Sequence, residues 1–480
     1  MHLNLFRLTL LWLIALVAPR STVFGSERHW TLMVYAAVDN NAEEGFVDEL
    51  AGALQFFGPT NGMELVILID RSSEYSTAKG PFDEDFSDTR LYRVTADGVS
   101  RLVGRPEFPE ITLDSNYEAN TADPAVLGKF IRFAKRAFPA RWYGLVLYGH
   151  ANGRAMLPDE QAKSRTSAAA LREAIRTDGA VDLTAVDLCS MGGIETAYEW
   201  RPGNGGFATN MLVAIPSAGE ALPWHWIFRR VSPPADMPDA VKSPREVPEL
   251  SALTPKAFAD LIVEETSAYR WHRLKRTKPS LRRVVILGYE SAGAYDLRHA
   301  EQVKRAVDRF AANLHRHQSK DALEALRGPA QKPKLMQFTF DIRRRWAKMP
   351  YFDLADLARR VSESEEFHAE VRRSARSVVE SVDSLVTSSF GMRSLKGFSD
   401  GRNGIYIMFP DGDEPVESDR LWHQFSWHDE SHGQRGYGHW AFSSDGATPG
   451  NGVVENWFEL LDAWYDDDTV PDGGLNRYEW

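Results

Sequence analysis

Short apolar runs alternate along the first part of the chain with longer segments in which apolar residues recur every three or four positions. Runs made almost entirely of Val, Ile, Leu and Ala are typical of strands buried on both faces, whereas the longer spacing is typical of amphipathic helices. We expect strands at Thr31–Val38, Leu65–Asp70, Trp142–Tyr148, Leu183–Leu188, Leu212–Ile215 and Val284–Tyr289. We expect helices at Ala42–Phe56, Pro124–Ala137, Ala168–Arg176 and Ile194–Trp200. This alternation predicts an α/β protein with a mostly parallel sheet flanked by helices.

The pattern changes after residue 290. Charged segments with helical spacing cover Tyr295–His315 and Phe352–Leu385, and the apolar run Gly404–Phe409 predicts a late strand. We expect a main domain at residues 26–290 and a C-terminal helical and mixed accessory region at residues 291–480 that completes the fold. Prolines at positions 233, 234, 238, 244 and 248 predict an irregular stretch, for which we favour a loop at the rim of a site over a linker.

The first residues have the features of an export signal. The eleven-residue apolar run Leu8–Ala18 follows Arg7 and is too short to cross about 30 Å of hydrocarbon. The tripeptide Val23–Gly25 then places small or compact residues where a signal peptidase cleaves. We expect a signal peptide at residues 1–25, a secreted or periplasmic mature protein, and no stable membrane insertion after the signal is removed.

The charge balance argues against nucleic-acid binding. The chain has 56 Lys and Arg against 67 Asp and Glu, a net charge of −11, so its surface as a whole repels anionic polymers. Basic residues gather at positions 271–278 and 343–345, and such short runs are typical of the solvated face of a helix. We therefore expect no nucleic-acid partner.

The chain has a single cysteine, Cys189, which has no partner for an intrachain disulfide. In an exported protein, an unpaired thiol is either deeply buried or chemically active, and the residue by itself leaves both open. Cys189 follows the predicted strand that ends at Leu188, and His150 follows the strand that ends at Tyr148. Because parallel strands present their carboxyl ends at one edge of a sheet, we expect Cys189 and His150 to lie together there.

A cysteine beside a histidine suits nucleophilic catalysis. The thiolate attacks a carbonyl carbon, and the imidazole takes the thiol proton and later protonates the leaving group. The oxyanion that develops needs hydrogen-bond donors, which we assign to the backbone N–H groups of Cys189 and Ala151. The strand that follows ends near Pro216–Glu220, so we expect Ser217 and Glu220 beside the site, with Glu220 either in a substrate pocket or exposed on its loop.

A histidine cluster near the C-terminus offers a competing signal. It partly matches the helical zinc-peptidase motif, but Asp429 stands where that motif needs its general base, and Gly433 and Gly436 argue against a helix. We interpret the cluster as a surface loop and expect no metal site there. Its members are His423, His428, His432 and His439.

Five segments, in order along the chain, carry a family resemblance. They are Tyr35–Glu43, Leu147–His150, Asp187–Met191 with Glu195, Tyr351–Leu357 and Gly404–Pro410. Together they resemble the clostripain family of cysteine peptidases, which share a caspase-like fold, and the likeness spans roughly residues 30–465. The resemblance implies that Cys189 is the nucleophile and that His150 is the general acid/base.

The resemblance also implies a substrate specificity, and the chain departs from the family at one position of the site. Family members that cleave after Arg or Lys carry an acidic residue two positions before the cysteine, here Asp187, at the floor of the primary pocket. A carboxylate there suits a guanidinium, although Asp187 is also placed to cap the helix after the nucleophile. Ala151 stands where the family usually has glycine, so a positive φ at this oxyanion-hole position would be strained.

Family members are often cleaved between the histidine and the cysteine, and some need calcium. The polar segment Pro158–Arg165 suggests self-cleavage after Lys163 or Arg165. The chemistry itself requires no cofactor, and a calcium requirement follows from the resemblance alone. The carboxylates Asp83, Glu84, Asp85 and Asp88 lack ordered ligand spacing, so we interpret them as a solvated loop.

Two functions from different classes follow. The first is an exported cysteine endopeptidase that cleaves protein or peptide substrates after Arg or Lys, with a Cys-His dyad and an acyl-enzyme intermediate. The second is a non-catalytic caspase-like module that binds a peptide or a component of the cell envelope. Turnover of an arginyl or lysyl amide distinguishes the two.

Overall fold

A computed structural model describes most of the chain. The described residues are 28–58, 62–95, 98–217, 219–239, 242–276, 290–329, 332–338, 350–391, 395, 397–409, 437–448 and 450–465. The expected signal peptide, the strand expected at Val284–Tyr289, the basic run at 343–345 and three of the clustered histidines lie outside these residues. No helix within the described ranges is long and apolar enough to span a membrane.

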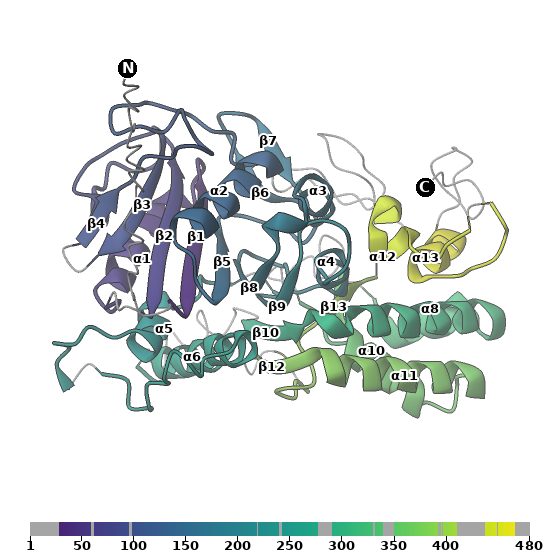
Figure 1. The fold of residues 1–480 in the computed structure, drawn as a ribbon. Helices are drawn as coiled ribbons and strands as arrows, with labels where there is room; N and C mark the ends of the chain where they lie inside the picture. The colour runs from purple at the N-terminus through teal and green to yellow at the C-terminus, as the bar shows by residue number, and fades with distance from the viewer. Residues whose placement is uncertain are drawn as a thin grey trace, which may run out of the picture.

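A nine-stranded sheet forms the centre of the molecule, in the order β12-β10-β9-β8-β5-β1-β2-β3-β4 (Figure 1). Its five middle strands are parallel: β1 (Trp30–Val38), β2 (Met63–Arg71), β5 (Trp142–Tyr148), β8 (Val181–Asp187) and β9 (Thr209–Ala214). The antiparallel flanking strands are β3 (Thr89–Thr95), β4 (Gly98–Arg101), β10 (Ser291–Asp296) and β12 (Val386–Gly391). The predicted α/β class and the mostly parallel sheet are confirmed.

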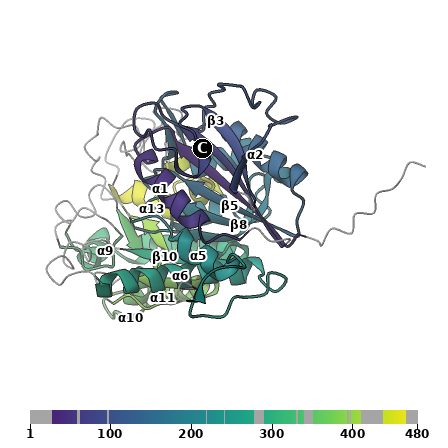
Figure 2. The same cartoon turned by 90° about the vertical axis from the view of Figure 1, so that its left-hand side faces the viewer.

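Helices cover both faces of this sheet, because alternate residues of each middle strand are apolar on opposite sides. On β1, Met33 and Tyr35 belong to one buried cluster, whereas Leu32 and Val34 belong to the other. One face carries α1 (Glu43–Leu54), α5 (Trp224–Val231) and α6 (Pro255–Arg276). The other face carries α2 (Pro124–Ala137), α3 (Ala168–Ala174) and α4 (Ile194–Glu199). Figure 2 shows α1 and α2 on opposite sides of the strands.

The later elements complete the molecule. They are α8 (Ala300–His317), α9 (Lys320–Arg327), β11 (Tyr351–Asp353), α10 (Leu354–Glu363), α11 (Ala369–Leu385), β13 (Tyr406–Met408), α12 (Ala441–Ser444) and α13 (Trp457–Tyr465). Two small sheets pair β11 with β13 and β6 (Met156–Asp159) with β7 (Ser164–Thr166). Within the described residues, short 3-10 turns cover Gly80–Phe82, Thr177–Gly179, Leu297–His299 and Tyr437–His439.

Two of the expected long helices are interrupted. The segment expected as a helix from Tyr295 instead begins with β10, where Tyr295 is buried and pairs with Leu212, and α8 starts at Ala300. The segment expected as one helix from Phe352 begins with β11 and then divides into α10 and α11. Asp353 ends β11 and caps α10, because its side chain accepts a hydrogen bond from Asp356 N. Helical spacing alone did not reveal these strands, because both are only a few residues long.

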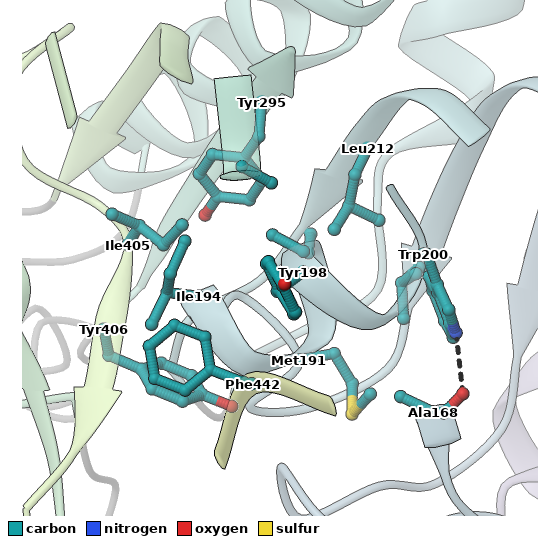
Figure 3. Close-up of a cluster of buried hydrophobic side chains, with 14 of the residues drawn as sticks. Ala168, Met191, Ile194, Tyr198, Trp200, Leu212, Tyr295, Ile405, Tyr406 and Phe442 are labelled. Atoms are coloured by element: carbon teal, nitrogen blue, oxygen red, sulfur yellow. Dashed lines mark hydrogen bonds between the residues drawn. The ribbon is translucent and has the colours of Figure 1, made fainter. Parts of the chain in front are cut away.

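The main sheet contains strands from both of the regions expected from the sequence. β10 and β12 belong to residues 291–480, yet they extend the sheet beyond β9. The buried cluster on the α4 face likewise combines Ile194 and Tyr198 of α4 with Tyr295, Ile405 and Phe442, as Figure 3 shows. The boundary expected at residue 290 therefore falls between two strands of one sheet.

Candidate active site

Three neighbouring strands deliver polar side chains to the same edge of the sheet. Residues Ala36 on β1, Tyr148 on β5 and Asp187 on β8 are paired across these strands near their carboxyl ends. Asn41, His150 and Cys189 follow these strands within a few residues. His150 and Cys189 each lie two residues beyond the paired Tyr148 and Asp187. β5 and β8 are thus adjacent and parallel in the sheet.

His150 is half-buried, and its imidazole contacts the loop after β1. The Nε2 atom lies 2.8 Å from Asn41 Oδ1. The preceding residue, Gly149, has a φ of 150°, and a Cβ atom there would lie 2.7 Å from the Ala37 carbonyl oxygen. Glycine at this position therefore lets the loop that carries His150 pass close to β1.

Asn41 is a site residue that the sequence analysis missed. It was not singled out, because two consecutive asparagines before an amphipathic segment are typical of a helix N-terminus. In the structure the N-cap of α1 is Ala42, with no side-chain cap, while Asn40 Oδ1 accepts a bond from Ala42 N at 3.0 Å. The available signal was the position of Asn41 at the carboxyl end of a strand, at the same edge as Cys189 and His150.

Cys189 is partly exposed, and the turn around it is tightly held. Its Sγ atom lies 3.9 Å from the Gly219 carbonyl oxygen. The next residue, Ser190, is buried in a left-handed conformation with a φ of 57°, and its N–H donates to the Ser217 carbonyl at 2.9 Å. Desolvation raises the pKa of the Cys189 thiol, and the nearby Asp187 carboxylate raises it further. A thiol in this environment requires a neighbouring base before it can attack a carbonyl.

Ala151 does not take the positive φ that would strain an alanine. The described non-glycine residues with positive φ are Asp83, Leu157, Lys163 and Ser190. Ala151 forms an isolated antiparallel bridge with Met156, and the hydrogen bonds of that bridge are donated by Asn152 N and Leu157 N. The bridge therefore does not consume the Ala151 N–H. Replacement of the family's usual glycine by alanine imposes no backbone strain here.

Asp187 is buried at the end of β8, with both carboxylate oxygens bonded. Oδ1 accepts from Leu222 N at 2.8 Å, and Oδ2 accepts from Trp224 Nε1 at 2.9 Å. Burial raises the pKa of this carboxyl to about 7. The alternative that Asp187 caps the next helix is wrong, because α4 starts at Ile194 and its N-cap is Gly193.

Glu220 and Ser217 lie in the loop after β9 but make different contacts. Glu220 is partly exposed and forms ion pairs with Arg270, at 2.7 Å, and with Arg273. Ser217 is buried, and its hydroxyl lies 3.3 Å from the Ser291 hydroxyl. Because Glu220 is paired with two guanidinium groups of α6, its charge is largely compensated within the chain.

A cavity of about 750 Å³ lies on the α1, α5 and α6 side of the sheet. Leu222 and Trp224, which bond the Asp187 carboxylate, form part of its wall, together with Tyr148 and Glu49. The Tyr148 hydroxyl donates to Glu49 Oε2 at 3.0 Å, and burial raises the pKa of the Glu49 carboxyl. The cavity therefore combines aromatic walls with acidic groups next to the residue two positions before the cysteine.

The described residues contain no group of three or more His, Cys, Asp and Glu side chains placed to hold a metal ion. Of the four clustered histidines, only His439 lies within the described residues, in a 3-10 turn. The acidic segment around Asp85 instead forms ion pairs, between Arg71 and Asp85 and between Arg90 and both Glu84 and Asp88.

Lys163 and Arg165, the two expected cleavage points, differ in solvent exposure. Lys163 is exposed in the turn between β6 and β7, with a φ of 51°. Arg165 is buried within β7. An extended peptide must enter a protease groove, so an exposed turn is the better substrate of the two.

Comparisons with known proteins cover almost the whole chain. The model of the clostripain family matches residues 34–457. The chain is 32% identical to clostripain of Hathewaya histolytica over 485 residues, which cover 94% of this chain and 89% of that protein.

Solved structures resemble the fold. An inactive zymogen of a C11 protease from Parabacteroides distasonis matches with a TM-score of 0.51 and 15% identity, over 81% of this chain and 94% of that one. A secreted C11 cysteine protease from Bacteroides thetaiotaomicron, in complex with an irreversible peptide inhibitor, matches with a TM-score of 0.53 and 15% identity over the same shares. At this identity the structures support the fold, which is that of the C11 proteases.

These matches favour the peptidase over the non-catalytic binding module. The family model extends across the sheet and the later elements and includes all five segments that carry the resemblance, and the curated relative matches 94% of the chain. The chain therefore belongs to the clostripain family of cysteine peptidases and is a cysteine-type endopeptidase that acts on peptide substrates.

Proposed function

We propose that this peptidase cleaves after Arg or Lys by means of Cys189 as nucleophile and His150 as general acid/base. The observation that carries the proposal is the parallel pairing of β5 with β8, which brings the loops of His150 and Cys189 to one edge of the sheet. The second support is Asp187, a buried carboxyl two residues before the cysteine and beside the 750 Å³ cavity.

The reaction follows from these groups. His150 accepts the Cys189 proton, and the thiolate attacks the substrate carbonyl carbon to form a tetrahedral oxyanion. The N–H groups of Cys189 and Ala151 are the proposed donors to that oxyanion. His150 then protonates the leaving amine as the C–N bond breaks, which leaves an acyl-enzyme. Water, deprotonated by His150, attacks the acyl carbon, and the thiol leaves with the proton restored.

Asp187 is proposed to select the basic residue. A substrate guanidinium or ammonium would replace Trp224 Nε1 as the partner of Oδ2, and a charge-assisted bond is stronger than the neutral indole bond. An acidic or neutral substrate side chain offers no such compensation. Because Glu220 is already paired with Arg270 and Arg273, we assign it a supporting role at the loop and no direct contact with the substrate cation.

The test compares arginyl, lysyl and neutral amide reporters on the wild type and on three variants. We expect Cys189→Ala and His150→Ala to lower kcat at least about 1,000-fold, because each removes a partner of covalent catalysis. Asp187→Asn should lower kcat/KM for basic reporters about 100-fold. The rate of thiol alkylation should not fall, because the substitution removes a carboxylate that raises the pKa of the Cys189 thiol. Asp182→Asn, on the same strand, is the matched control. Turnover by Cys189→Ala at the wild-type rate would refute the proposed nucleophile.

Self-cleavage is proposed at Lys163, the exposed residue of the β6–β7 turn. We expect Lys163→Ala to keep the chain intact on a denaturing gel, and Arg165→Ala to be cleaved like the wild type, because Arg165 is buried. Cys189→Ala should also stay intact. Cleavage of Lys163→Ala at the wild-type position would contradict this assignment.

Export and calcium dependence remain predictions. The apolar segment Leu8–Ala18 and the secreted relative from Bacteroides thetaiotaomicron support a secreted or periplasmic location. A calcium requirement rests on the family resemblance alone. The proposed chemistry proceeds through Cys189 and His150 and draws on no cofactor.

A further inference from the structure

A hydrogen bond joins the loop after β1 to the imidazole of His150. The Nε2 atom of His150 lies 2.8 Å from the Oδ1 atom of Asn41. We propose that Asn41 is a positioning residue, which holds His150 in the tautomer and orientation that turn Nδ1 toward proton exchange with Cys189. This inference rests on the proposed function, because it assumes that His150 is the base.

The chemistry of the contact selects the tautomer. An amide oxygen only accepts hydrogen bonds, so Nε2 must carry the proton that forms the bond. A neutral imidazole has one N–H, and the lone pair is therefore on Nδ1. When His150 takes the Cys189 proton at Nδ1, the Nε2–H bond to Asn41 persists. The ring keeps its orientation through proton uptake and release.

The loop that carries Asn41 is itself fixed. The buried Asn40 donates through Nδ2 to the carbonyls of Ala37 at 3.1 Å and Pro158 at 2.8 Å. Asp39 is also directed elsewhere, because its Oδ2 accepts from Gln161 N at 2.8 Å. The consecutive residues 39–41 thus have separate partners, and Asn41 is the one whose side chain reaches His150. The bond is therefore set by the folded loop before any substrate binds.

Asparagine at position 41 differs from aspartate in the charge that it places beside His150. Asn41 orients the ring without adding a negative charge beside it, whereas an aspartate would favour the protonated imidazolium. His150 must lose its proton before it can activate the thiol. A neutral acceptor therefore holds the ring without adding charge stabilisation to the protonated form.

The test uses Asn41→Ala and Asn41→Asp with an arginyl amide reporter. We expect Asn41→Ala to lower kcat about 10- to 100-fold with KM within about 2-fold, which is part of the about 100- to 10,000-fold that a positioned acid–base supplies. Asn41→Asp keeps an acceptor of the same length and should retain kcat within about 10-fold of the wild type at its own optimal pH. Asn210→Ala, at the start of β9, is a matched control that should leave kcat unchanged. Asn41→Ala with wild-type kcat, beside an inactive His150→Ala, would overturn the positioning role.

A second readout does not depend on turnover. In ¹⁵N spectra of Cys189→Ala, the signals lost on addition of His150→Ala belong to His150. At a pH where the ring is neutral, we expect a protonated Nε2 and an unprotonated Nδ1, and we expect Asn41→Ala to mix the two tautomers. A proton on Nδ1 in the presence of Asn41 would refute the inference. Wild-type turnover in both Cys189→Ala and His150→Ala would instead refute the proposed function, so the two failures are distinguishable.

Discussion

At the scale of single residues, the environment of Asp187 differs from that of a surface carboxylate. Its two oxygens are bonded to Leu222 N and Trp224 Nε1, yet burial dominates and raises the pKa of the carboxyl to about 7. This pKa lies well above the ordinary 3.8 of an aspartate, so the carboxyl changes charge near neutral pH. A substrate cation would bind its ionised form, whereas the protein alone favours its protonated form.

This predicts opposite pH effects on stability and on specificity. A carboxyl whose pKa is higher in the folded chain than its ordinary 3.8 holds its proton more tightly when folded, so the free energy of unfolding falls as pH rises from about 4 to about 7. Over the same range, kcat/KM for an arginyl reporter should rise as Asp187 ionises. Asp187→Asn should flatten the fall in Tm with pH, whereas Asp114→Asn, at an exposed site, should not.

Thermal unfolding followed between pH 4 and 8 measures the first effect. A Tm profile of Asp187→Asn that parallels the wild type would show that this carboxyl does not contribute to the pH dependence. Steady-state rates with the arginyl reporter measure the second effect. If the ratio of kcat/KM between Asp187→Asn and the wild type stayed constant from pH 4 to 8, the predicted effect of Asp187 ionisation on specificity would be contradicted.

At the scale of elements, the strand exits decide the geometry of the site. Gly149 is the first residue after β5, and a Cβ atom added there would lie 2.7 Å from the Ala37 carbonyl oxygen of β1. β8 leaves through Cys189 and the left-handed Ser190, whose carbonyl accepts from the Tyr406 hydroxyl at 2.5 Å. The loop that carries His150 therefore passes close to the β1 backbone, and the turn after Cys189 is bonded by a side chain of β13.

A substitution at Gly149 tests whether the close approach to β1 positions the loop that carries His150. We expect Gly149→Ala to lower Tm by several degrees and kcat at least about 10-fold, because the new Cβ displaces the loop that carries His150. Gly203→Ala is the matched control, since Gly203 also has a positive φ, of 82°, but has no atom within 4 Å of the added Cβ. Equal losses of kcat in the two variants would show that φ strain, rather than the clash with β1, sets the effect.

The errors of the sequence analysis also belong to this scale. Tyr295 was assigned to a helix, but it lies in β10, and its hydroxyl is bonded to the Gly404 carbonyl. The helical spacing around it was real, because α8 follows a few residues later. A strand of this length directly before a helix has too few residues for its own period to appear, so its pairing with β9 was needed to identify it.

At the scale of the whole molecule, the later part of the chain packs against α4, the helix that follows Cys189. Glu195 of α4, the helix after Cys189, is buried and accepts from Met408 N at 2.8 Å and from the Tyr437 hydroxyl at 2.9 Å. Burial raises the pKa of this carboxyl to about 7. The bonds tie α4 to β13 and to the 3-10 turn that begins at Tyr437. The described residues after position 290 therefore contribute to the same core as α4, the helix after Cys189.

A truncation tests this dependence. We expect a chain that ends at residue 290 to lack cooperative thermal unfolding, because it would expose the edge of β9 and the apolar faces that Tyr295, Ile405 and Phe442 cover. Near-UV circular dichroism and a thermal scan, compared with residues 26–480, provide the measurement. A sharp unfolding transition of the shorter chain would show that residues 26–290 fold as an independent domain.

The sequence by itself determined the elements whose residues interact locally. The bounds of β5 and α2 agree with the expected ranges, because a run of buried apolar residues and a capped amphipathic segment, with Asp123 before Pro124, are complete local signals. The order of the strands then predicted that Cys189 and His150 lie at one edge. The comparisons confirmed the family resemblance and the class of enzyme, a cysteine-type endopeptidase.

Only the tertiary structure decided which side chains meet across distant segments. Asn41 contacts His150 across 109 positions, and Asp187 is bonded by Leu222 in the loop before α5 and by Trp224 at the start of α5. The antiparallel pairing of β9 with β10 likewise joins strands that are far apart in the sequence. Local propensity carries no information on such contacts, because their free energy arises when separate segments are brought together and desolvated.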